Sequence, residues 1–220
     1  VGSEMCIRDR GSSNGIDTSF FTVQNIISKE ELRNRWGIGT TDLVFVFVGR
    51  IVKDKGINEL VRSFVELKKS YNDIRLLLVG GFERELDPLA EDVEDKISKD
   101  SFIISVGCQS DVRPFLVMAD VLAFPSYREG FPNVVMQAGA MGLPSIVTDI
   151  NGCNEIIQDG VNGKIIPPKN EKALYEAMKW MYEHHKTKVK EMAQRARPII
   201  VERYEQKKVW EELLKEYKRL

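Results

Sequence analysis

The sequence predicts an α/β fold, in which a single doubly wound parallel sheet of the Rossmann type is followed by a helical C-terminal tail. From residue 43 onward, short apolar runs alternate with amphipathic segments of helix length, as parallel strands joined by helical crossovers require. Hydrophobic residues make up 43% of the 220 residues and charged residues 30%, which is typical of a globular domain with a full core. Disordered and fibrous classes are therefore excluded.

The start of the chain does not fit this pattern. Residues 1–10 begin without Met and contain neither the apolar core of a signal peptide nor helical periodicity. We therefore predict that residues 1–10 are an unrelated or artefactual leader and that the chain is a fragment of a longer protein. Residues 11–40 are expected to form a linker that leads into the domain.

Five apolar runs predict the strands of the sheet, at residues 43–48, 74–79, 102–106, 121–124 and 145–148. The segments between them predict crossover helices at residues 58–70, 113–118 and 134–141. In the first of these helices the apolar residues share one face, namely Leu60, Val61, Phe64, Val65 and Leu67. Ligands of such sheets bind outside the carboxyl ends of the strands, where loops and helix N-termini converge.

Beyond the fifth strand, turn signals give way to a long helical segment. Asp159-Gly160 and Asn162-Gly163 predict a tight turn, and a pair of prolines at 167–168 ends the next segment. Residues 171–220 are predicted to be helical and highly charged. The Rossmann-like domain is thus expected to span residues 41–185, with C-terminal helices at 186–220.

Charge and cysteine content exclude several classes of function. The 32 basic residues balance 33 acidic ones to a net charge of −1, so no nucleic-acid partner is expected. Cys6, Cys108 and Cys153 show no C-x-x-C spacing, and His184 and His185 are expected to be solvated, so neither disulfides nor a metal site is predicted. No apolar run reaches the ~20 residues that span a bilayer. We expect a cytoplasmic protein, with at most peripheral association at the inner face of the cytoplasmic membrane.

A first cluster of candidate binding residues follows the first strand. Gly49 and Arg50 come directly after the strand, and Lys55-Gly56 precede the next helix. The glycines allow a ligand to approach the backbone, and the two cations lie beside a helix N-terminus that already favours anions. This arrangement predicts a cradle for a diphosphate group. The alternative is that both cations are merely solvated.

A second cluster leads from the fourth strand into a helix. Gly130 permits close approach and Pro132 suits the first turn of a helix, so the backbone amides of residues 131–134 are expected to form a second rim for anions or hydroxyl groups. Glu129 is available there as an acceptor. The alternative for Glu129 is a helix cap without a ligand.

The two clusters together carry a family resemblance. The first has the pattern G-R-x-x-x-x-K-G and the second E-G-F-P-N-x-x-x-Q-A-x-A-x-G-L-P-x-I. This pair resembles the C-terminal, donor-binding domain of retaining GT-B glycosyltransferases (glycosyltransferase group 1, or family 4) of the bacterial surface-polysaccharide type. The resemblance runs from about residue 14 to residue 220, and it implies that the sheet is one half of a GT-B fold.

The resemblance implies a role for individual residues. Arg50 and Lys55 would hold the donor diphosphate and stabilise it as leaving group, and Glu129 would accept a hydrogen bond from the donor sugar; these three are the implied catalytic residues. The implied donor-binding residues are Gly49, Gly80, Gly107, Cys108, Gly130, Phe131, Pro132, Asn133, Val134 and Gln137.

The implied reaction is transfer of a sugar from a nucleotide diphosphate sugar to a glycan or lipid-linked acceptor in polysaccharide assembly. It proceeds with retention at the anomeric carbon and without a cofactor or an obligatory metal. The partner it implies is an N-terminal GT-B domain, and without that domain the isolated chain is expected to be inactive. A non-catalytic module that binds a nucleotide sugar is the alternative, whereas a dinucleotide-dependent oxidoreductase is disfavoured because no G-x-G-x-x-G follows the first strand.

One position departs from the family pattern. The motif usually has two glutamates eight residues apart, and here Glu129 is followed at that spacing by Gln137. A glutamine makes neutral hydrogen bonds, which are about half as strong as those of a carboxylate. Weaker or differently selective binding of the donor ribose is therefore expected.

Other conspicuous residues receive a structural interpretation. Cys108 and Cys153 are predicted to pack rather than to act as nucleophiles, because no histidine is near either in the sequence. Glu155 is expected to cap a short helix. The apolar residues of the last helix are expected to remain partly exposed; they are Val209, Trp210, Leu213, Leu214 and Tyr217.

Overall fold

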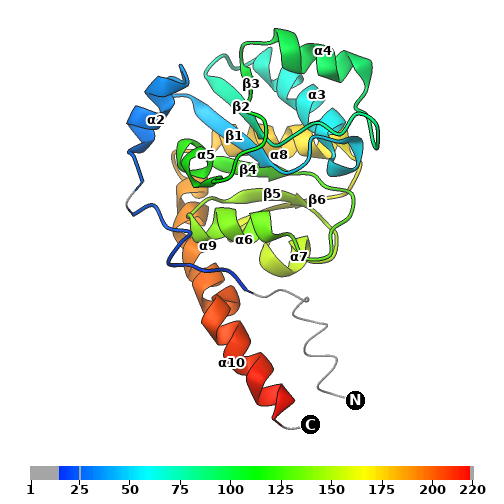
Figure 1. Cartoon of the computed structure of the whole chain (residues 1–220). Coiled ribbons are helices and arrows are strands. Elements are labelled where there is room, and N and C mark those ends of the chain that lie inside the picture. The colour runs from blue at the N-terminus through cyan, green and yellow to red at the C-terminus, as the bar shows by residue number, and fades with distance from the viewer. Residues whose placement is uncertain (1–14, 25, 219–220) are drawn as a thin grey trace.

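The computed structural model describes residues 15–24 and 26–218, which form a six-stranded parallel sheet covered by helices (Figure 1). The strand order is β3-β2-β1-β4-β5-β6, the Rossmann order, so the predicted fold class is confirmed. The strands are β1 (Leu43–Val48), β2 (Ile74–Val79), β3 (Ile103–Ser105), β4 (Val121–Phe124), β5 (Ser145–Thr148) and β6 (Gly163–Ile166).

The helices pack on the sheet in pairs. Helix α3 packs against α8, α6 against α9, and α2 against α5. Because the strand order reverses direction between β1 and β4, successive crossovers on either side of this point lie on opposite faces of the sheet. The helical elements are α2 (Lys29–Arg35), the 3-10 turn η1 (Lys53–Lys55), α3 (Ile57–Lys68), α4 (Glu91–Lys99), α5 (Arg113–Met118), α6 (Asn133–Ala140), α7 (Cys153–Ile156), α8 (Glu171–Glu183), α9 (Lys188–Tyr204) and α10 (Gln206–Tyr217).

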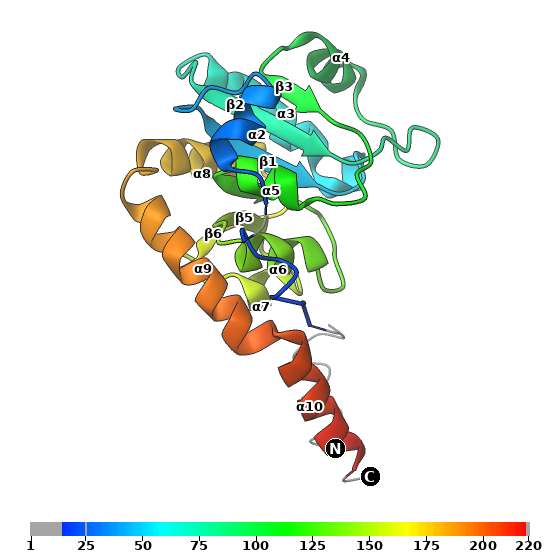
Figure 2. The same ribbon diagram turned by 60° about the vertical axis from the view of Figure 1, so that its left-hand side comes forward.

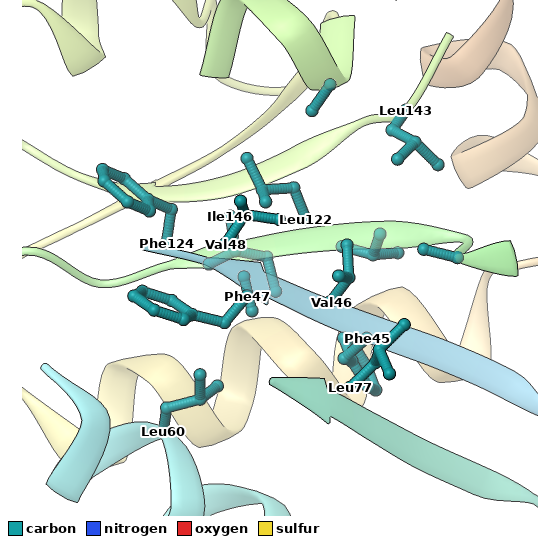
Figure 3. Close-up of a cluster of buried hydrophobic side chains, with 14 of the residues drawn as sticks. Phe45, Val46, Phe47, Val48, Leu60, Leu77, Leu122, Phe124, Leu143 and Ile146 are labelled. Carbon is teal, nitrogen blue, oxygen red and sulfur yellow. The ribbon is translucent and has the colours of Figure 1, made fainter. Parts of the chain in front are cut away.

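The core lies along the central strands. All six residues of β1 are buried, as expected for a strand that is covered on both faces. Figure 3 shows Phe47 beside Phe124 of the neighbouring strand, and their rings stack with centroids 5.8 Å apart. Leu60 of α3 is fully buried in the same cluster. These aromatic contacts fix β1 against β4, the two strands from whose ends the candidate site is built.

Three regions of the fold differ from the sequence-based expectation, and one of them is α4, a crossover helix between β2 and β3 that was not predicted. The sheet has a sixth strand, β6, which begins at Gly163, where only a turn was predicted. Helix α2 lies inside residues 11–40, the expected linker, and its Ser28 cap accepts a hydrogen bond from the amide of Glu31 at 3.2 Å. The expected leader, residues 1–10, lies outside the described residues. Within the described residues, no helix is long and apolar enough to cross a bilayer.

Candidate donor site at the carboxyl ends of β1 and β4

The candidate site lies where the strand order reverses, at the carboxyl ends of β1 and β4. The loops that leave these strands and β2 pack so closely that side chains are excluded at two glycines. A Cβ atom on Gly80 would lie 1.8 Å from the carbonyl oxygen of Gly49, and one on Gly56 would lie 2.2 Å from that of Pro125. The loops after β1, β2 and β4 therefore form a single surface.

The pair Lys55 and Glu129 joins the two sequence clusters. Lys55 Nζ donates to Glu129 Oε1 at 2.6 Å, and the two side chains are only 14% and 17% exposed. Ser126 Oγ donates to the same carboxylate oxygen at 2.8 Å, and its own backbone carbonyl accepts from Thr148 Oγ1. Glu129 is thus held by a cation and a hydroxyl and does not serve as a helix cap in these contacts.

Arg50 lies at the same edge but faces a different carboxylate. Its Nη1 donates to Glu83 Oε2 at 2.7 Å, and 52% of the Arg50 side chain is exposed. The hydrogen bond that Arg50 donates to Glu83 raises the pKa of Arg50 above its usual value. Arg50 is therefore charged and open to a further anion, since it has donors that this contact does not use.

Tyr127 fastens the β4 loop to the β1 loop. Its backbone amide donates to the carbonyl of Asp54 at 2.9 Å, and its hydroxyl donates to Glu59 Oε1 at 2.6 Å. The pKa of Tyr127 is raised mainly by burial and in second place by the hydrogen bond to Glu59. The hydroxyl therefore remains protonated and a donor at neutral pH. Tyr127 lies two residues before Glu129 in the sequence, but its long-range contacts to Asp54 and Glu59, on either side of Lys55, had no sequence signal.

The second rim is formed where helix α6 begins. Pro132 is the residue before the helix and not within its first turn, and it has no N–H to donate. Asn133 and Val134 occupy the first turn, whose amides lack partners within the helix. The carbonyl oxygen of Gly130 lies against the next loop, 2.7 Å from where a Cβ on Gly152 would be, whereas a Cβ on Gly130 itself would meet open space.

Gln137 follows one turn later on α6 and is partly buried. Asn133 and Gln137 are four residues apart and therefore share a face of the helix. Among the described residues, the Gln137 side chain makes no hydrogen bond. Phe131 is anchored from the other side by Tyr204 of α9, with ring centroids 5.6 Å apart.

The third part of the edge is the loop after β3. Gly107 accepts a hydrogen bond from the amide of Gly80 at 2.9 Å, which joins this loop to the one after β2. Cys108 is exposed, so its predicted packing role is wrong: the short strand β3 ends before it, and its Sγ lies only against Gly81 among the described glycines, where a Cβ would be 2.8 Å away. Cys153 is buried as predicted, and burial raises the pKa of its thiol to about 12.

Two further expectations have clear outcomes. Glu155 caps α7 as predicted, because its Oε1 accepts the amide of Gly152 at 3.2 Å. The prediction that His184 and His185 are solvated is wrong: both are partly buried, and each ring nitrogen Nδ1 lies within 2.9 Å of a carbonyl oxygen of the preceding turn. In the part of the chain that the structure describes, no group of acidic, histidine or cysteine side chains could hold a metal ion.

Comparison of the sequence with known proteins identifies its relatives. The profile of the family described as "Glycosyl transferases group 1" matches residues 28–198. The capsular polysaccharide biosynthesis glycosyltransferase CapM of Staphylococcus aureus is 30% identical over 92% of this chain and 52% of its own length. The N,N'-diacetylbacillosaminyl-diphospho-undecaprenol alpha-1,3-N-acetylgalactosaminyltransferase of Campylobacter jejuni is 31% identical over 66% of this chain and 37% of its own length. The chain spans about half, or less, of the length of these relatives.

Solved structures share the fold. The crystal structure of Anabaena HepE in complex with UDP and glucose has a TM-score of 0.83 at 20% identity, over 94% of this chain and 56% of HepE. The C-terminal domain of LpcC, a glycosyl transferase group 1 family protein of Francisella tularensis, has a TM-score of 0.75 at 23% identity, over 86% of this chain and 98% of that domain. The fold is that of one half of a GT-B glycosyltransferase.

Proposed function

The chain belongs to the glycosyl transferases group 1 family, and from this premise we propose that it is the donor-binding half of a retaining, nucleotide-sugar-dependent glycosyltransferase. The observation that carries the proposal is the convergence of Arg50, Lys55 and Glu129 at the point where the strand order reverses. Lys55 from the loop after β1 pairs there with Glu129 from the loop after β4, and Arg50 lies at the same edge, where open α/β sheets bind their ligands.

In the proposed reaction the donor diphosphate is the leaving group, and it gains negative charge as the bond to the sugar breaks. Lys55 has three N–H donors, of which one is used by Glu129, and Arg50 has five, of which one is used by Glu83. The remaining donors are available to stabilise the growing charge. The first-turn amides of Asn133 and Val134 add neutral donors at the same edge.

Glu129 is proposed to accept a hydrogen bond from a hydroxyl group of the donor sugar. Its Oε1 already receives Lys55 and Ser126, so Oε2 is the oxygen that faces the ligand in this proposal. Gln137, one turn into α6, would meet the ribose with a neutral amide. No cofactor or metal is required for these roles, because the two cations take the place that a metal ion would have beside a diphosphate.

The relatives support the substrate class. HepE was crystallised with UDP and glucose. UDP contains a diphosphate group, which is the group that Arg50 and Lys55 would bind in this proposal. The names of CapM and of the Campylobacter enzyme specify capsular polysaccharide and a diphospho-undecaprenol-linked acceptor, respectively. We therefore propose a glycan or lipid-linked acceptor, bound in cooperation with a second GT-B domain, and sugar transfer that needs both domains.

The test is calorimetric titration of the purified chain with UDP, GDP and ADP, with Arg50→Ala and Lys55→Ala alongside. We expect one nucleotide to bind, and each substitution to weaken binding roughly tenfold or more, since charged hydrogen bonds contribute about 1.5–3 kcal/mol each. Arg35→Ala is the matched control, because Arg35 is an exposed arginine whose partner Glu31 lies on the same helix, α2. Unchanged affinity in both site variants would refute the cradle.

A further inference from the structure

The loop after β2 contains a turn that directs two carboxylates at the loop after β1. The amides of Leu86 and Asp87 both donate to the carbonyl of Glu83 at 3.2 Å, which closes the turn. From this turn Glu83 reaches Arg50, and Asp87 Oδ2 accepts the backbone amide of Asp54 at 2.6 Å. One turn therefore supplies two acidic contacts to the segment that carries the candidate cations.

The two contacts differ in kind. Asp87 binds backbone, and its own carbonyl accepts the amide of Lys53 at 3.4 Å, so it fixes the course of η1. Within the part of the chain that the structure describes, the Glu83 carboxylate contacts only a side chain, the guanidinium of Arg50, and 33% of the Glu83 side chain is exposed. An ion pair as exposed as that of Arg50 and Glu83 contributes little to stability. Another anion can therefore replace the Glu83 carboxylate beside Arg50.

Arg50 also lies in an acidic surrounding. Besides Glu83, the charges of Asp54 and Glu129 act on its guanidinium. An incoming diphosphate is attracted by Arg50 and repelled by the nearby carboxylates, of which Glu83 is the one in direct contact with Arg50.

We infer that Glu83 is a built-in counter-ion of Arg50, which occupies the guanidinium in the free protein, is displaced by the donor diphosphate, and thereby sets donor affinity. The inference rests on the proposed function, because it assumes that Arg50 binds the donor. Glu83 acts through Arg50 and is a positioning residue, whereas Asp87 on the same turn is structural.

The expected effect of Glu83→Gln follows from charge. The substitution removes one negative charge from the diphosphate site and frees Arg50, so affinity for an anion rises. An exposed ion pair of this type contributes little free energy. Because the diphosphate no longer has to displace it, we expect the affinity of Glu83→Gln for the diphosphate to rise about two- to fivefold. The gain should shrink as salt is raised, because the pair is exposed and therefore screened.

The experiment is calorimetric titration of the wild-type chain and Glu83→Gln with UDP, GDP, ADP and inorganic pyrophosphate, at low and high salt. Two controls accompany it. Glu31→Gln makes the same change of charge on the surface of α2 and should leave affinity unchanged. In the background of Arg50→Ala, Glu83→Gln should give a clearly smaller gain, because only the repulsion by Glu83 is removed and no guanidinium is freed; a gain as large as in the wild-type background would contradict the counter-ion role.

The outcomes separate this inference from the proposed function. A nucleoside diphosphate that binds the wild type but binds Glu83→Gln equally or more weakly overturns the counter-ion role and leaves the proposed function standing. Tighter binding of pyrophosphate to Glu83→Gln, without binding of any nucleoside diphosphate, retains the counter-ion role and refutes the nucleotide site. If no probe binds any variant, both are wrong.

Thermal unfolding completes the test, because it distinguishes the two carboxylates of the turn. Glu83→Gln should leave the midpoint unchanged, whereas Asp87→Asn should lower it, since the amide of Asp54 loses a charged acceptor. A fall of the midpoint in Glu83→Gln as large as that in Asp87→Asn would make Glu83 a structural residue and overturn the inference.

Discussion

Cys108 and Cys153 follow strands of the same sheet, yet their thiols differ in exposure to solvent. Cys108 is exposed beside Gly107, whereas Cys153 is fully buried and has a pKa of about 12. A raised thiol pKa lowers the fraction of reactive thiolate at any pH below it. Cys153 is therefore protected from alkylation in two ways: reagents cannot reach the buried sulfur, and little of it is present as thiolate.

This contrast gives a prediction about alkylation. In the native chain at pH 8, iodoacetamide should modify Cys108 and leave Cys153 unmodified until the chain is unfolded, as peptide mass spectrometry would show. A bound nucleoside diphosphate should slow modification of Cys108, because the proposed donor site includes it. Denatured chain is the control for intrinsic reactivity. Equal rates for both thiols in the native state would contradict the burial of Cys153.

The candidate site was predictable from the sequence only in part. Arg50, Lys55 and Glu129 follow strands that were recognisable, and the carboxyl ends of parallel strands meet at one edge, so their proximity could be expected. The roles assigned to them remain predictions. The partners Glu83 and Tyr127 could not be foreseen, because their contacts depend on how three loops fold against one another.

At the scale of secondary-structure elements, helix α2 is held by one buried arginine. Arg33 donates to the carbonyl of Met118 through Nε at 2.9 Å and to Asp120 Oδ2 through Nη2 at 2.7 Å. Asp120 also accepts the amide of Val44, so the same carboxylate holds α2 and the start of β1. Lys29, one turn earlier on α2, pairs with the other oxygen of Asp120.

We predict that Arg33→Ala lowers the free energy of unfolding by on the order of 3 kcal/mol, because several carbonyls lose their charged donor and the partly buried Asp120 keeps, among the described residues, only Lys29 as a cationic partner. Urea unfolding measures the change. Arg35→Ala, on the same helix but exposed and paired only with Glu31, should change it by less than about 0.5 kcal/mol. Comparable losses in the two variants would show that α2 is not anchored through Arg33.

The elements that the sequence predicted are those with a strong apolar pattern. Strand β1 is buried along its whole length, and so its apolar run was unambiguous. Helix α2 has only two buried residues, Leu32 and Arg33. Its attachment to the domain depends on the charged contacts of Arg33 and Lys29 more than on an apolar face, so an apolar pattern could not reveal it. Strand β6 contains Gly163 and Lys164 and lies at the edge of the sheet, where the requirement for apolar residues is weaker.

At the scale of the whole molecule, α10 stands apart from the sheet. Figures 1 and 2 both show it extending beyond the body of the domain, and it contacts α9. Trp210 and Leu214 are each more than half exposed, as the sequence predicted, and Tyr217 is exposed as well. The chain turns at Glu205, where the amide of Gln206 donates to Ile16 and that of Ile16 donates to Tyr204.

This pairing divides the C-terminal region into a part that supports the fold and a part that does not. Tyr204, the last residue of α9, is buried, and its hydroxyl donates to the carbonyl of Glu155 behind the candidate site. Two residues later the chain leaves the core, since α10 begins at Gln206. The boundary between the two parts is therefore the backbone pairing at Ile16 and Glu205.

We predict that the double variant Trp210→Gln, Leu214→Gln lowers binding of an apolar dye such as ANS and leaves the free energy of unfolding within about 0.5 kcal/mol of the wild type, because both side chains are solvent-exposed on a helix that glutamine tolerates. Tyr204→Ala is the control, and loss of its buried ring should cost about 3 kcal/mol. Dye fluorescence and urea unfolding of the same samples measure both quantities. A loss of stability in the double variant as large as in Tyr204→Ala would mean that the apolar face of α10 is covered in solution. Unchanged dye binding would mean that these two residues are not the exposed apolar surface.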